Sequence, residues 1–153
     1  MKQARTTMDE HKYDALKLEN QLCFPLYAAS KEIVKRYRPY LEPLGLTYTQ
    51  YLVMMVLWER RQLNVKELGD RLYLDSGTLT PVLKNLESKG YLTRCRSEKD
   101  ERVLLVSITD DGTALRDRAL PVPEKMGSCV RLGSEEALAL YTLLHKLLGG
   151  FEE

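Results

Sequence analysis

The sequence has few of the residues that would identify a disulfide-rich, metal-binding or membrane protein. Its three cysteines, Cys23, Cys95 and Cys129, are too scattered for a disulfide framework and lack the Cys/His spacing of a zinc site. No apolar run approaches the ~20 residues that span a bilayer, and the N-terminal stretch lacks the apolar core of a signal peptide. We therefore expect a cytoplasmic chain with reduced thiols, no membrane partner, no metal and no other cofactor.

Excess positive charge is also scarce. The chain has 23 Lys and Arg against 22 Asp and Glu, a net charge of +1. Nucleic-acid-binding proteins usually have a stronger basic excess, so DNA binding would depend on where the basic side chains lie. With 153 residues, 44% of them hydrophobic, the chain is long enough for one globular domain, or for a small domain with helical extensions.

The stretch Leu72–Gly90 has the pattern of a short amphipathic helix with clear ends. Asp75 suits the cap of its N-terminus, and Gly90 suits the left-handed conformation that ends a helix. The apolar side chains recur at helical spacing, at Leu79, Val82, Leu83 and Leu86. The other faces are polar, with Ser76, Thr78, Thr80, Lys84 and Asn85. Such a helix fits a DNA major groove, although an ordinary surface helix has the same pattern.

The flanking segments favour DNA binding. Asn64 and Glu67 start a short preceding helix, which makes a helix-turn-helix with the one just described. Residues 91–96 and 102–108 have strand character and are joined by the polar turn 97–101. Basic residues lie on or near this hairpin: Arg94, Arg96, Lys99 and Arg102. The order of elements predicts a winged helix, while the acidic residues in the turn are also consistent with a simple solvated loop.

The two ends of the chain are predicted to be helical. An apolar stripe runs from Tyr13 to Tyr37, and Pro25 either kinks that helix or begins a new one. Pro39 and Pro43 are expected to end it. Thr47 and Gln50 form a capping box before an apolar helix that we expect to be central.

After the wing, residues 109–111 cap another helix, and a last apolar helix follows Gly133. We predict a mostly α fold with a small β-hairpin wing. The winged helix-turn-helix is expected at residues 46–109, dimerisation helices at 13–45 and 110–153, and a tail at 1–12. A two-fold homodimer would space two reading helices by about one DNA turn, which suits a near-palindromic operator.

Several segments resemble the MarR family of winged-helix repressors and, within it, the organic hydroperoxide resistance regulators. The similar segments are LENQLCFPLY (18–27), GLTYTQYLVMMVLWE (45–59), ELGDRLYLDSGTLTPVLKNLE (67–87) and SEKDERVLLVSIT (97–109). The resemblance implies that the helix around Ser76–Lys84 enters the major groove and that Arg102 on the wing reaches the minor groove. The chain departs from the usual pattern at Pro25 and at Cys95.

The same resemblance implies a thiol sensor. Cys23 would be the peroxide-sensing residue, Tyr37 and Tyr48 would hydrogen-bond it across the dimer, and Cys129 would be the second cysteine of a two-cysteine subgroup. The chemistry agrees, because phenol hydroxyls that donate to a thiolate stabilise its charged form, and a sensor needs an accessible thiolate. Phe24 and neighbouring apolar side chains would favour organic hydroperoxides.

Each thiol also has a simpler interpretation, since an unpaired cysteine is often inert packing. Residues 125–129 are expected to be flexible enough for Cys129 to move and resolve an oxidised Cys23, although Cys129 could be incidental. We interpret Cys95 as a bystander.

We therefore predict a repressor that senses organic hydroperoxides through cysteine oxidation and then releases its operator. The expected DNA-binding residues are Asp75, Ser76, Thr78, Thr80, Lys84, Arg94, Arg96 and Arg102. One alternative replaces the thiol switch with a small phenolic or apolar ligand. Another is a thiol peroxidase that uses Cys23 and Cys129, but no peroxidase motif surrounds Cys23, and we predict a protein that is not an enzyme.

Overall fold

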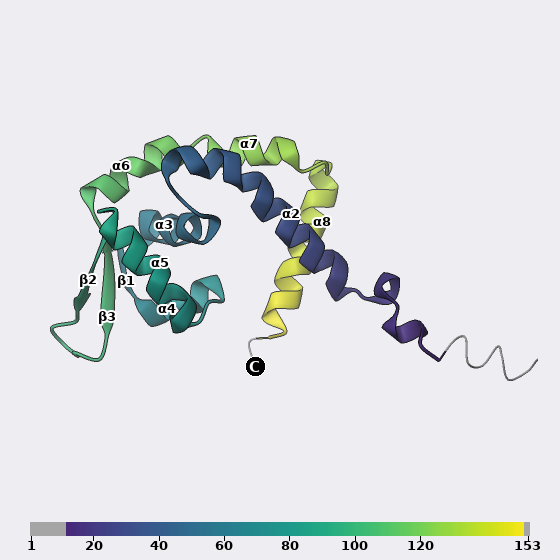
Figure 1. Cartoon of the computed structure of the whole chain (residues 1–153), viewed down its shortest axis with the longest axis horizontal. Coiled ribbons are helices and arrows are strands. Elements are labelled where there is room, and N and C mark those ends of the chain that lie inside the picture. Colours follow the sequence, from purple (N-terminus) through teal and green to yellow (C-terminus); the bar gives the residue numbers. More distant parts are fainter. Residues whose placement is uncertain (1–11, 152–153) are drawn as a thin grey trace, which may run out of the picture. The chain divides into compact units, whose positions relative to one another are not determined.

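A computed structural model describes residues 12–151 and divides into two compact units, one ending at Ala119 and the other beginning at Leu120 (Figure 1). The first unit contains the helices α2 (Cys23–Leu41), α3 (Tyr48–Arg60), α4 (Val65–Leu72), α5 (Ser76–Ser88) and α6 (Asp110–Ala119), and the strands β1 (Gln62–Asn64), β2 (Leu92–Arg96) and β3 (Leu104–Ile108). The second contains α7 (Val122–Cys129) and α8 (Ser134–Gly149). The predicted mostly helical fold with a small sheet is confirmed.

The N-terminal helix is shorter than the sequence pattern predicted. Residues 14–20 form two 3₁₀ turns, Asp14–Leu16 and Leu18–Asn20, and the α-helix begins only at Cys23. Pro25 therefore lies in the first turn of α2, where its missing N–H removes no intrahelical hydrogen bond. Pro25 belongs to the start of a helix, which settles the two possibilities for this residue. Most of the predicted tail, 1–12, lies outside the described residues.

Pro39 does not end the helix, contrary to the prediction. Helix α2 continues through Pro39 to Leu41, and a 3₁₀ turn, Glu42–Leu44, follows and contains Pro43. The proline lies in the last turn, and the N–H of Glu42 still donates to the carbonyl of Arg38. Gly45 then reverses the chain with a left-handed φ of 68°, a conformation that suits glycine.

Helix α3 is central, as its apolar sequence predicted. Val53, Met54 and Leu57 have no exposed surface. The expected capping box is confirmed, because the N–H of Gln50 donates to Thr47 Oγ1 and the Gln50 side chain accepts from the N–H of Thr47.

Helices α4 and α5 form the predicted helix-turn-helix. Asn64 and Glu67 make the capping box at the start of α4. The turn between the helices is tight: Tyr73 takes a left-handed φ of 53°, and the N–H of Leu74 donates to the carbonyl of Gly69. A Cβ on Gly69 would lie 2.6 Å from the Leu74 carbonyl oxygen, so the turn needs glycine at this position.

The predicted hairpin is confirmed and belongs to a three-stranded sheet in the order β1-β3-β2. Strands β2 and β3 are antiparallel, with Leu92 opposite Ile108 and Arg96 opposite Leu104. The short strand β1 was missed by the sequence analysis. It pairs with β3, with Leu63 opposite Val106, and both side chains are buried.

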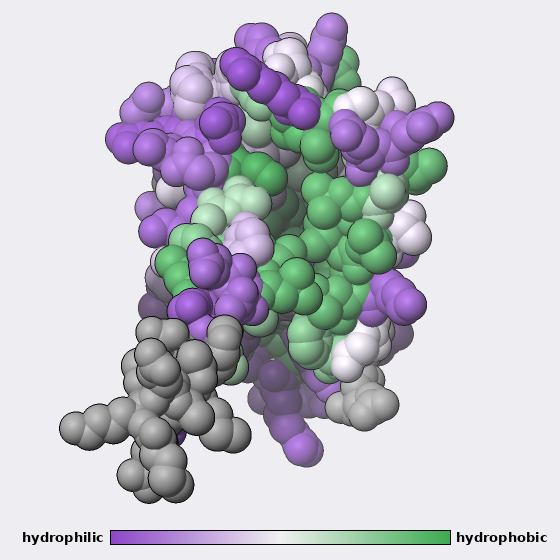
Figure 2. Space-filling model, turned by 90° about the vertical axis from the view of Figure 1, so that its right-hand side faces the viewer, coloured by the Kyte–Doolittle hydropathy of each residue, from purple (hydrophilic) through white to green (hydrophobic). Residues whose placement is uncertain are grey.

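The second unit has little core of its own. Along the described helix Ser134–Gly149 no side chain is buried, and Leu138, Tyr141 and Leu143 are each at least 60% exposed. Hydrophobic side chains also reach the surface in the first half of α2. The face of the molecule drawn in Figure 2 has a large hydrophobic area. Apolar helices exposed in this way require a partner. None of the helices within residues 12–151 is long and apolar enough to cross a membrane.

Candidate redox site and nucleic-acid interface

Cys23 is the first residue of α2, and its side chain is exposed. Leu22 precedes it and caps the helix without a side-chain hydrogen bond. A helix N-terminus presents N–H groups without intrahelical partners and the positive end of the helix dipole. The apolar neighbours of Cys23 are also exposed, Leu22 at 75%, Phe24 at 42% and Tyr27 at 61%. The thiol is accessible to an oxidant and has an apolar surround.

The two predicted supporting tyrosines lie together. Tyr37 on α2 and Tyr48 at the start of α3 have ring centroids 4.7 Å apart. Burial raises the pKa of both phenols above its ordinary value of 10.0, and for Tyr48 the neighbouring Tyr37 contributes further. Both groups therefore keep their protons at neutral pH and can donate hydrogen bonds to an anion.

The aromatic cluster is larger than the sequence analysis predicted. Tyr51 lies 5.9 Å from Tyr37 and 6.1 Å from Trp58, measured between ring centroids. Trp58 Nε1 donates to the carbonyl of Gly112 on α6 at 2.8 Å. Tyr51 is only 3% exposed; its place one turn after Tyr48 on an apolar helix was the signal that could have identified it.

Cys23 does not reach these tyrosines within its own chain. Cys23 and Tyr37 occupy the same helix, fourteen positions apart. At about 1.5 Å of rise per residue, the two positions are separated by about 21 Å along the axis. The structure thus places the thiol and the phenols apart in one subunit.

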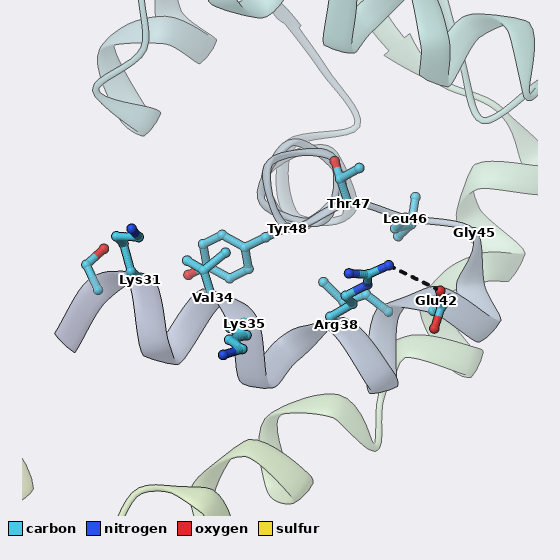
Figure 3. A pocket seen from close by; sticks show the side chains of 11 residues that line it. Lys31, Val34, Lys35, Arg38, Glu42, Gly45, Leu46, Thr47 and Tyr48 are labelled. Carbon is cyan, nitrogen blue, oxygen red and sulfur yellow. Dashed lines mark ion pairs between the residues drawn. The ribbon is translucent and has the colours of Figure 1, made fainter. Parts of the chain in front are cut away.

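A cavity of about 760 Å³ adjoins Tyr48. It lies between the second half of α2 and the segment 45–48, with the Tyr48 ring turned toward Val34 (Figure 3). Its apolar lining includes Val34, Leu41 and Leu46. Basic side chains also line it, namely Lys31, Lys35 and Arg38, and Arg38 lies 4.0 Å from the Glu42 carboxylate.

The other two cysteines have different settings. Cys129 is partly exposed and is the last residue of α7, with its Sγ 3.4 Å from the carbonyl of Lys125. The segment 125–129 is therefore helical, whereas its sequence predicted a flexible segment. Cys95 is exposed on the wing strand β2, opposite Leu105. Among the described residues, no group of three or more His, Cys, Asp or Glu side chains could hold a metal ion.

Helix α5 has one buried apolar face and an exposed polar face, as expected. Leu79, Leu83 and Leu86 are buried at 0–1% exposure. The five predicted DNA-binding residues of this region, Asp75, Ser76, Thr78, Thr80 and Lys84, are all exposed.

Two of these polar residues also hold the start of α5. Asp75 caps it by accepting from the N–H and the hydroxyl of Thr78, and these bonds lower the pKa of the Asp75 carboxyl. The carboxylate is therefore charged at neutral pH, and it fixes the conformation of the helix start.

The three predicted wing arginines differ in their surroundings. Arg94 pairs with Glu87 of α5: its Nε and Nη2 donate to Oε2 and its N–H donates to Oε1. Arg96 Nη1 donates to the carbonyls of Glu101 and Arg102 across the loop. The Arg102 side chain is 96% exposed and lies 3.8 Å from Asp100. Arg94 thus connects the wing to α5, while Arg102 projects from the wing tip.

Comparison with known proteins gives consistent matches. A family model described as transcriptional regulator SarA/Rot matches residues 31–118. The organic hydroperoxide resistance transcriptional regulator of Bacillus subtilis is 50% identical over 142 residues, 90% of this chain and 97% of that protein.

Two solved structures of AbfR from Staphylococcus epidermidis are also similar. Reduced AbfR bound to DNA superposes with a TM-score of 0.74 at 36% identity, over 93% of this chain and 99% of that chain. Disulfide-formed AbfR gives a TM-score of 0.64 at 34% identity, over 95% and 99%. The fold and these matches agree: the chain belongs to the MarR-like winged-helix transcriptional regulators, in the branch of the organic hydroperoxide resistance regulators.

Proposed function

We propose that the chain forms a homodimeric repressor in the cytoplasm that binds a near-palindromic operator and releases it when an organic hydroperoxide oxidises Cys23. The observation that carries this proposal is the separation of the exposed thiol from its own tyrosines. Cys23 lies at the start of α2, and the protonated Tyr37 and Tyr48 lie near the other end. In an antiparallel pairing of two copies, the thiol of one subunit would meet the phenols of the other.

The exposed apolar residues around Cys23 support such a pairing. Leu22, Phe24 and Tyr27 would lose contact with water in the dimer. The cavity beside Tyr48 offers apolar surface of the kind that these side chains, or the organic part of a hydroperoxide, would fill.

The oxidation proceeds in two balanced steps. The Cys23 thiolate attacks the terminal oxygen of the hydroperoxide, the O–O bond breaks, and the leaving alkoxide takes a proton to become an alcohol. Cys23 is now a sulfenic acid. The Cys129 thiol of a partner subunit then attacks the sulfenic sulfur, water leaves, and a disulfide forms. A thiol reductant such as thioredoxin would reverse the change.

The dimer would release DNA if oxidation changes the distance between its two α5 helices. In the reduced form, the exposed face of α5 would enter the major groove and Arg102 the minor groove. AbfR has been solved reduced on DNA, overoxidised on DNA and with a disulfide formed, so that related protein exists in several oxidation states.

The test treats wild type, Cys23→Ser and Cys129→Ser with cumene hydroperoxide, and compares operator binding with non-reducing gels. Wild type should release the operator and run as a reducible dimer, while Cys23→Ser should stay bound. Release by Cys23→Ser would remove Cys23 from the sensor role. A reducible dimer of Cys129→Ser would remove Cys129 from the disulfide.

A second candidate function is release by a small ligand, and the cavity lined by Tyr48 and three basic residues favours it. A phenolic carboxylate such as 4-hydroxybenzoate would match this lining. The probe is added to a protein that carries Cys23→Ser, Cys95→Ser and Cys129→Ser. Operator release by this protein would support ligand control, and continued binding would exclude it for this probe.

A further inference from the structure

Gln50 has a role that its capping box does not explain. Among the described residues other than tyrosine it is the only polar or charged side chain that is buried, at 6% exposure. Its Nε2 donates to Asn85 Oδ1 on α5 at 2.7 Å, and its Oε1 accepts from Lys89 Nζ at 3.2 Å. Thr47, the cap of α3, also donates to the same Oε1 through its N–H. One amide thus connects the start of α3 to the end of α5.

Lys89 extends this connection to the end of α2. Its Nζ donates to the carbonyl of Gly45 at 2.6 Å. Gly45 is the left-handed residue between the 3₁₀ turn that follows α2 and the segment that leads into α3. The three side chains Gln50, Asn85 and Lys89, here called the amide link, therefore attach the last turn of the DNA-reading helix to the junction of α2 and α3.

The amide link differs from the apolar packing of α5. The back of this helix packs through Leu79, Leu83 and Leu86, and apolar contacts tolerate small displacements because they have no directional requirement. Hydrogen bonds require a defined distance and angle, and a buried amide that loses its partners destabilises the folded protein. A shift of the α2–α3 junction would therefore move the end of α5, or break these bonds.

We propose that the amide link is the positioning element that transmits oxidation of the sensor to the reading helix. Gln50, Asn85 and Lys89 contact neither the oxidant nor the reacting sulfur. They fix the position of α5 relative to the junction that follows Tyr37 and precedes Tyr48. This inference rests on the proposed redox function and names the residues that couple its two ends.

The test compares the operator affinity of the reduced and the peroxide-treated dimer in Lys89→Met and Asn85→Ala. Both positions are exposed at the end of α5. Asn85→Ala removes the bond from Gln50, and Lys89→Met removes the bonds to Gln50 and to the Gly45 carbonyl. In the reduced state, we expect each variant to bind the operator with an affinity within about threefold of that of wild type. The ratio of oxidised to reduced Kd should fall at least about fivefold, since the lost coupling lies in the usual range for two linked sites. If the link has only a structural role, each substitution should lower operator affinity by the same factor in the reduced and the oxidised dimer and leave this ratio unchanged.

Two control variants separate the hydrogen bonds from other effects. Lys89→Arg keeps a donor and the charge, and should keep the wild-type ratio. Arg118→Met removes a bond of the same kind, from Arg118 on α6 to the Pro43 carbonyl of the same junction, and should also keep it.

The outcomes distinguish this inference from the proposed function. If wild type releases its operator and the ratio in Lys89→Met and Asn85→Ala equals that of wild type, the amide link does not transmit the signal and only this inference is overturned. If wild type itself keeps its operator after oxidation, the proposed function fails and this inference fails with it.

Discussion

Cys23 and Tyr37 lie on one helix, fourteen residues apart, so the thiol and the phenol of a single chain do not meet. The separation of about 21 Å along the axis exceeds any hydrogen bond several-fold. If the phenols stabilise a thiolate at Cys23, they must come from a second subunit. This geometry makes the dimer part of the proposed sensor, in addition to its role in spacing the reading helices.

Arg102 should contribute to DNA binding through charge. Its side chain is 96% exposed at the wing tip, so Arg102→Ala should weaken operator binding without unfolding the wing. The slope of log Kd against log salt concentration should fall by about 1, since one fewer counterion is released. Arg116, exposed on α6, is the control, and Arg116→Ala should keep the wild-type slope. An unchanged affinity for Arg102→Ala would make the wing tip a solvated loop.

Arg94 should act on stability through Glu87, because its guanidinium is engaged by that carboxylate. The hydrogen bonds from Arg94 lower the pKa of the Glu87 carboxyl below its ordinary value of 4.5. A lowered pKa in the folded state means that the stabilisation is complete above the ordinary value and is lost as the pH falls through the folded value.

Urea unfolding of wild type and Glu87→Gln between about pH 3 and about pH 7 measures this effect. Wild type should be more stable at neutral pH, and the difference should shrink as the medium becomes acidic below the ordinary pKa of the carboxyl. A difference that stays constant across the range would show that the charge of Glu87 does not matter.

Gly69 should tolerate no side chain. A Cβ at this position would lie 2.6 Å from the Leu74 carbonyl oxygen, so the turn between α4 and α5 must shift. We expect Gly69→Ala to lower the free energy of unfolding by about 1–3 kcal/mol, as overpacked sites do. Gly127 on α7 is the matched control, because nothing lies within 4 Å of its Cβ position. Gly127→Ala should stabilise by about 0.5–1 kcal/mol. Equal effects at both positions would contradict the steric argument.

Local sequence signals predicted most of the helix starts. Thr47, Asn64 and Asp75 each cap the helix that was expected, because a cap and its partner lie only three residues apart. Strand β1 was not predicted, since three residues carry no period and their pairing with β3 comes from a segment more than forty residues away. Residues 14–20 were predicted as α-helix from an apolar stripe that 3₁₀ turns also accommodate.

In the candidate site, too, contacts between distant elements were not predicted. The sequence pattern placed Arg94 on a strand, which is confirmed. It left open whether a helix starts near Cys23, and the structure begins α2 at this residue. The sequence pattern did not predict that Glu87 engages Arg94, or that Gln50 reaches Asn85, because these partners belong to different elements. The DNA-binding residues and the redox pair remain predictions for the experiments described.

The most direct test of a sensor built across the dimer uses mixed dimers. One subunit carries Cys23→Ser, and the other carries Tyr37→Phe with Tyr48→Phe, which keeps the rings and removes the hydroxyls. The rate at which cumene hydroperoxide oxidises Cys23 is measured by stopped-flow and compared with wild type and with the dimer of double-Phe subunits. If the tyrosines act on the partner's thiol, the mixed dimer has one intact site and oxidises its single Cys23 at the wild-type rate. A rate equal to that of the double-Phe dimer would contradict the account.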